Sequence, residues 1–129
     1  MPSAESYHQD EYRRWFDTFG ERTRKAEELV QSAREHLRRS GNDNAVRLLE
    51  GDAWQEISIQ GTPTQFPFGL LTNPFPPFLS ASDLASPDDA EQLAQALEAW
   101  HQAKVALGYA YGHLSDESKA MLPRLPFPR

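Results

Sequence analysis

The stretch SYHQDEYRRWFDTFGERTRKAEELVQSAREHLRR, residues 6–39, decides how this chain folds. Apolar side chains recur in it at intervals of four and three residues, at Tyr12, Phe16, Phe19, Ala26, Val30, Ala33 and Leu37, with Thr23 in the one gap. This spacing keeps one face of an α-helix turned toward a packing partner. Ser6 and Gln9 fit a capping box at its start, and Gly41 fits its end. The pattern predicts one helix, roughly 50 Å long, and its heptad spacing indicates a coiled-coil partner.

A second long helix is predicted over 87–113. Ser86 offers an N-cap, and Pro87 suits the first helical position. Four-and-three spacing then continues at Leu93, Leu97, Trp100, Lys104, Leu107, Tyr111 and Leu114. Shorter helices are expected over 43–50 and 116–122, followed by an extended tail over 123–129. The expected fold class is mainly α, with two long helices and short ones.

The connection over 54–82 is rich in proline and phenylalanine. No charged residue occurs from Ile57 to Ser82, yet five of the ten prolines lie there and exclude a membrane-spanning helix. Ile57 and Ile59 alternate with polar residues, and Phe66, Phe68 and Leu70 recur at every second position of residues 66–70. This alternation predicts a small β-hairpin or an irregular segment. Such an apolar segment either covers the helices or docks on a partner.

The composition favours a single, soluble, cytoplasmic domain. The chain has 129 residues and no cysteine, which excludes disulfides and thiolate chemistry. Its formal net charge is -6, which disfavours a polyanionic partner. Nine of the thirteen lysines and arginines lie between Arg13 and Arg47, but acidic residues share their helix face, so no direct nucleic-acid binding is expected.

Two Glu-x-x-His pairs, Glu5–His8 and Glu98–His101, are typical of carboxylate-bridged metal sites in helical bundles. Such a site needs further inward carboxylates, and neither predicted helix offers one at a core position. No catalytic motif occurs either: the sequence lacks G-x-S-x-G, H-E-x-x-H and a phosphate-binding glycine loop. We therefore expect no metal, cofactor or catalytic residue.

The function predicted from these features is protein–protein interaction without catalysis, as an adaptor, assembly subunit or inhibitor. It would act through the apolar stripe of the long helix and through the Pro/Phe-rich segment. The expected partner is another protein or the chain itself, in a homo-oligomer or a larger complex, with no membrane. The predicted anchors are the aromatic residues Trp54, Phe66, Phe68, Phe75 and Phe78, because aromatic side chains dominate interface energetics.

Two alternatives belong to other classes. The first is a small helical enzyme or ligand-binding protein with a histidine and aromatic pocket around Trp100, His101 and Tyr109. The second is a helical subunit of a nucleoprotein complex, in which the contacts to nucleic acid depend on the whole assembly.

Overall fold

The computed structural model describes residues 4–60 and 77–127. Helices predominate in it, which confirms the mainly α fold class. In chain order the elements are α1 (Ala4–Arg39), α2 (Asp43–Leu48), the 3-10 helix η1 (Ala53–Glu56), β1 (Ser58–Gln60), β2 (Phe78–Ser80), the 3-10 helix η2 (Ala81–Asp83), α4 (Pro87–Gly112) and α5 (Asp116–Met121). Within the described ranges no helix is long and apolar enough to cross a membrane.

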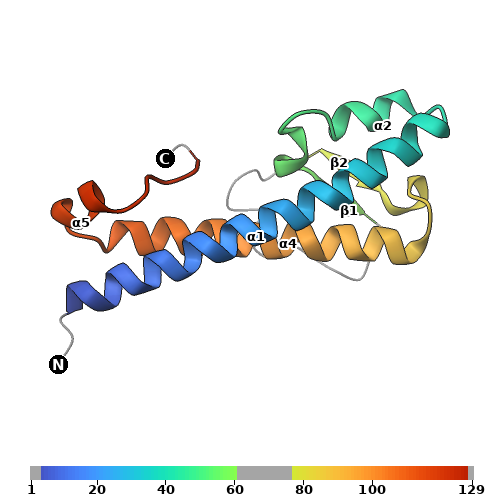
Figure 1. Cartoon of the computed structure of the whole chain (residues 1–129). Coiled ribbons are helices and arrows are strands. Elements are labelled where there is room, and N and C mark those ends of the chain that lie inside the picture. Colours follow the sequence, from blue (N-terminus) through green and yellow to red (C-terminus); the bar gives the residue numbers. More distant parts are fainter. Residues whose placement is uncertain (1–3, 61–76, 128–129) are drawn as a thin grey trace.

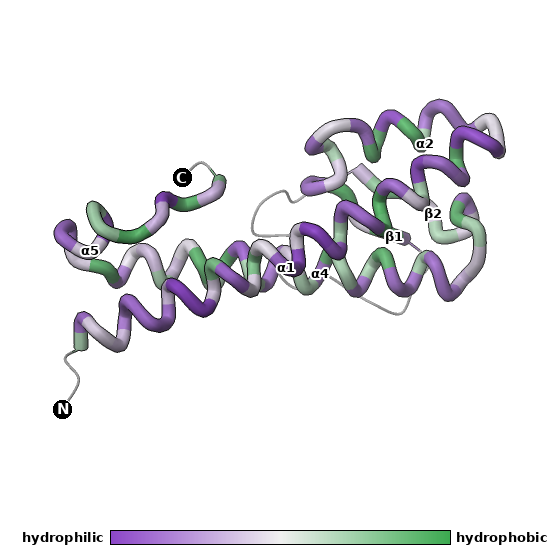
Figure 2. Tube along the Cα trace, in the orientation of Figure 1, coloured by the Kyte–Doolittle hydropathy of each residue, from purple (hydrophilic) through white to green (hydrophobic). Residues whose placement is uncertain are grey.

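Helices α1 and α4 run antiparallel and form the body of the molecule (Figure 1). The stripe of α1 is buried at Tyr12, Phe19, Ala26, Val30 and Leu37, and α4 buries Leu93, Leu97, Trp100 and Leu107. The rest of α1 is largely hydrophilic (Figure 2). The stripe therefore packs on a helix of its own chain, and its docking on a separate protein stays a prediction.

The helix ends follow from local hydrogen bonds. The Ser86 hydroxyl accepts a hydrogen bond from the backbone N–H of Asp89 at 3.1 Å, and Pro87 opens α4 as the sequence predicts. Gly41 follows α1 with φ +76°, a left-handed conformation that glycine adopts without steric cost. Asn42 then caps α2 by accepting a hydrogen bond from the N–H of Ala45.

The two strands form a parallel sheet. Ile59 of β1 pairs with Leu79 of β2, and both side chains are buried. Parallel strands cannot be joined by a tight turn, so this pair differs from the expected hairpin. The second strand predicted there, at 66–70, lies outside the described residues. Residues 78–80 pair with β1, whereas the prediction from sequence included them in the connection over 54–82 without assigning them to a strand.

At the opposite end of the helix pair, α5 and the chain after it return over α1 and α4 (Figure 1). The Tyr12 hydroxyl donates a hydrogen bond of 2.6 Å to the Pro123 carbonyl. The Phe127 ring lies 5.4 Å from that of Phe19, centroid to centroid, and covers Gly108. The described part of the extended tail therefore packs on the body of the molecule.

Candidate functional site

Two of the predicted partner-binding residues, Trp54 and Phe78, lie within the described residues, and they differ in exposure. Trp54 is only 2 % exposed, and its ring packs edge-on against Trp100 at 5.1 Å. It therefore belongs to the core in this structure, and its role as a docking anchor stays a prediction. Phe78 is 49 % exposed on β2, so its ring is accessible. The predicted anchors Phe66, Phe68 and Phe75 lie outside the described residues.

The three residues of the alternative pocket, Trp100, His101 and Tyr109, differ in exposure. Trp100 and His101 are buried, whereas Tyr109 is 72 % exposed on another face of α4. Burial, together with the positive charge of Lys104, lowers the pKa of His101 to about 4. His101 is thus a neutral core histidine at neutral pH.

The structure places the residues of the two Glu-x-x-His pairs in different settings. Glu5 accepts hydrogen bonds from the Ser118 hydroxyl and from the backbone N–H and hydroxyl of Ser115, and these bonds lower its pKa to about 2. It thereby ties the first turn of α1 to the start of α5. In the other pair, His101 is buried in the core. Within residues 4–60 and 77–127 no group of three or more His, Cys, Asp or Glu could hold a metal ion.

Four rings from α1 and α4 meet at the surface, and we call them the aromatic row: Tyr7, His8, Tyr109 and His113. The His8 and His113 rings stack across the two helices, with centroids 5.2 Å apart and planes 12° apart. Tyr7 packs edge-on beside His8 at 5.6 Å, and Tyr109 packs edge-on against His113 at 4.5 Å. Both tyrosines are largely exposed. The row is thus a continuous aromatic surface built on the two main helices.

Sequence reasoning missed the aromatic row. Tyr109 and His113 lie four residues apart, a spacing that places them on one helix face. That signal was readable in the sequence. The stack of His8 on His113 was not, because it depends on how α1 and α4 align.

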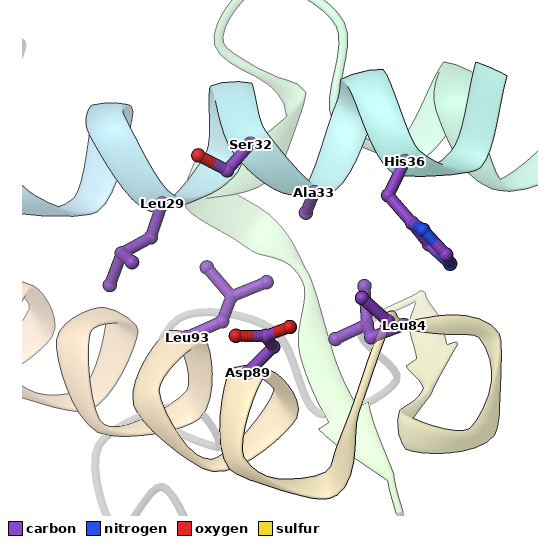
Figure 3. Close-up of a pocket in the computed structure, with 8 residues that line it drawn as sticks. Leu29, Ser32, Ala33, His36, Leu84, Asp89 and Leu93 are labelled. Atoms are coloured by element: carbon purple, nitrogen blue, oxygen red, sulfur yellow. The ribbon is translucent and has the colours of Figure 1, made fainter. Parts of the chain in front are cut away.

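The structure also contains a small cavity between the second half of α1 and the start of α4 (Figure 3). Its volume is about 90 Å³, and it is lined by Leu29, Ser32, Ala33, His36, Leu84, Ala85, Asp89 and Leu93. In Figure 3 the Asp89 carboxylate lies between Leu84 and Leu93, across from Ala33. The cavity therefore combines apolar walls with one carboxylate and one imidazole.

A larger and more polar hollow of about 250 Å³ lies between α1 and the chain that follows α2. Glu27, Arg34 and Asp52 contribute its charged groups. The Arg34 guanidinium already donates hydrogen bonds to the Leu49 carbonyl and to the Gln31 side chain. This hollow brings together charges of both signs, and its arginine serves mainly to fasten α2 to α1.

Comparisons with known proteins assign no family to the chain. No protein-family model matches the sequence, and searches of curated proteins and of solved structures find no match either. The functional argument therefore depends on the geometry described above.

Proposed function

We propose that this protein is a non-catalytic protein–protein interaction module that docks a partner protein on the aromatic row. The observation that carries this proposal is the exposure of Tyr7 and Tyr109, at 60 % and 72 %, within one continuous set of rings. Tyrosine combines a large apolar ring with a polar tip, and for this reason it is enriched at protein interfaces. The partner is another protein or a second copy of this chain, and the place of action is the cytoplasm.

The position of the aromatic row on the two main helices favours this function. The rings sit on α1 and α4, whose contacts make up the core, so little conformational entropy is lost when a partner binds. Val105 lies one turn before Tyr109 on α4 and is 40 % exposed, which extends the apolar surface along the helix. Phe78, which lies outside the aromatic row, is a further exposed ring. Docking through the Pro/Phe-rich segment stays a prediction.

Photo-crosslinking tests where the partner binds. A photoreactive amino acid replaces Tyr109 in one variant and the exposed Gln31 in a control. Gln31 lies 24 residues after Tyr7 on α1, which is about 36 Å along the helix axis. In cells that express the protein, we expect one partner to be crosslinked from position 109 and not from position 31. Equal crosslinking from both positions contradicts the proposal.

The partner found by crosslinking, or the chain itself, is then tested with purified proteins. Tyr7→Ser combined with Tyr109→Ser removes both exposed rings, and we expect it to raise the Kd at least about tenfold. Met121→Ser is the matched control, because Met121 is 76 % exposed but lies outside the aromatic row. Circular dichroism confirms that both variants keep their helices. Unchanged affinity in the double variant overturns the proposal, and sedimentation of the chain alone distinguishes self-association from binding to another protein.

A further inference from the structure

The cavity in Figure 3 has the walls of a site for an alkyl chain. Leu84 and Leu93 are buried at its base, and Leu29 and Ala33 face them from α1. Of its eight lining residues, five are leucine or alanine. Transfer of methylene groups from water onto such walls is favourable.

One carboxylate gives the cavity its charge. Asp89 lines it, and no lysine or arginine does so. The backbone N–H of Asp89 is already bound by the Ser86 hydroxyl, so the cap of α4 does not need the Asp89 side chain. No hydrogen bond or ion pair engages that carboxylate within residues 4–60 and 77–127. Its charge is therefore available to a ligand in the cavity.

The α4 side of the cavity is acidic. Between residues 48 and 103 the chain has eight acidic residues and no lysine or arginine. Asp83, Asp88 and Glu91 lie within six residues of Asp89. On the α1 side, residues 22–39 carry charges of both signs, so the preference for a cationic ligand depends on the α4 side.

We propose that the cavity binds the ammonium end of a short alkyl chain. The Asp89 carboxylate would pair with the ammonium, and the leucine and alanine walls would hold the methylenes. A volume of about 90 Å³ accommodates a chain of about five non-hydrogen atoms. The His36 ring, which lines the same cavity, offers a further polar contact. A small free amine and a lysine side chain of a partner protein both have this chemistry.

An NMR titration with n-butylammonium chloride tests the site, followed through the methyl signals of Leu29, Leu84 and Leu93. Butan-1-ol and sodium butyrate are the matched probes, with similar chains but a neutral or an anionic end. Because Asp89 is exposed, we expect n-butylammonium to bind about two- to fivefold more tightly than butan-1-ol, and butyrate not to bind. Equal affinity for the amine and the alcohol overturns the proposal, as does the absence of shifts at roughly 100 mM amine, a Kd too weak to mark a site.

Three variants separate charge from shape. Asp89→Asn removes the carboxylate and should weaken n-butylammonium binding about two- to fivefold. Asp88→Asn, one residue earlier and outside the cavity lining, removes a more distant charge and should weaken binding less than Asp89→Asn does. Ala33→Leu fills the cavity with the carboxylate intact and should abolish binding of the amine. Retained affinity in Asp89→Asn or in Ala33→Leu overturns the proposal.

A second ligand distinguishes a small free amine from a partner's lysine side chain as the source of the ammonium. Nα-acetyl-lysine N-methylamide presents a lysine side chain with neutral ends. If it shifts the same methyl signals and loses affinity in Asp89→Asn, the cavity accepts lysine side chains of a partner. If only n-butylammonium does so, the site is one for small free amines. Both results support ammonium binding and assign its source.

Discussion

The indole N–H of Trp100 donates a hydrogen bond of 2.9 Å to the hydroxyl of Thr23, which joins α4 to α1 within their interface. The same hydroxyl donates a bond of 2.7 Å to the carbonyl of Phe19, one turn earlier on α1. Thr23 thus satisfies a buried donor of the opposite helix. This explains why the apolar stripe of α1 contains one polar residue.

Thr23→Val keeps the shape of the side chain and removes the hydroxyl. The indole N–H of the buried Trp100 then has no acceptor, so we expect a loss of about 1–3 kcal/mol in the free energy of unfolding. Urea denaturation measures this loss. Thr23→Ser is the control, because it keeps the hydroxyl and loses only a methyl group. A valine variant as stable as the serine variant would show that the bond contributes nothing.

Trp54→Ala tests the assignment of this ring to the core. The side chain is buried against Trp100, so its removal leaves a large cavity, and we expect a loss of about 3–5 kcal/mol in unfolding free energy. Phe78→Ala removes a half-exposed ring and should cost less than about 1 kcal/mol. Far-UV circular dichroism in urea compares the two variants. Similar costs for both would refute the core assignment of Trp54.

The pH dependence of stability tests the buried His101. Its pKa is lowered from 6.5 to about 4 by burial and by Lys104, so the unfolded chain takes up a proton first as the pH falls. The stabilising effect of keeping this side chain neutral is complete above about pH 6.5 and is lost as the pH falls toward about 4.

His101→Gln removes this titration. We expect the loss of unfolding free energy between about pH 7.5 and about pH 4.5 to be smaller in His101→Gln than in the wild type. Urea denaturation at the two pH values gives both losses. Because each protein is compared with itself, a general destabilisation by glutamine does not affect the result. Equal losses in the two proteins would contradict the burial of a neutral histidine.

Alanine substitutions at Gly20, within α1, and at Gly41, just after it, should change the stability in opposite directions. Gly20 lies on the exposed side of α1, and a Cβ atom there would meet no atom within 4 Å. Gly20→Ala should therefore stabilise the protein by about 0.5–1 kcal/mol. Gly41 has φ +76°, so Gly41→Ala should destabilise it by about 1 kcal/mol. Thermal denaturation compares the variants, and the same sign for both would be inconsistent with these backbone conformations.

The aromatic row and the cavity around Asp89 were beyond prediction because each joins residues from distant parts of the chain. His8 and His113 are 105 positions apart, so no local pattern signals their stack. Ala33 and Asp89 face each other only because α1 and α4 pack antiparallel. The composition of 54–82 did predict an apolar segment, but not that Trp54 would enter the core or that residues 78–80 would pair in parallel with β1.

The sequence by itself determined the two long helices and the face that each of them buries. The four-and-three spacing in α1 and the Ser86-Pro87 start of α4 act within a few residues, so they can be read locally. Only the tertiary structure decided which surfaces meet. The stripe of α1 could have bound another chain, but α4 is tethered to it and covers it, which gives an intramolecular partner at high effective concentration. Lys104 also lies in the stripe of α4. The stripe accommodates its ammonium because Nζ lies 5.2 Å from the centre of the Trp100 ring, where a cation–π interaction is favourable.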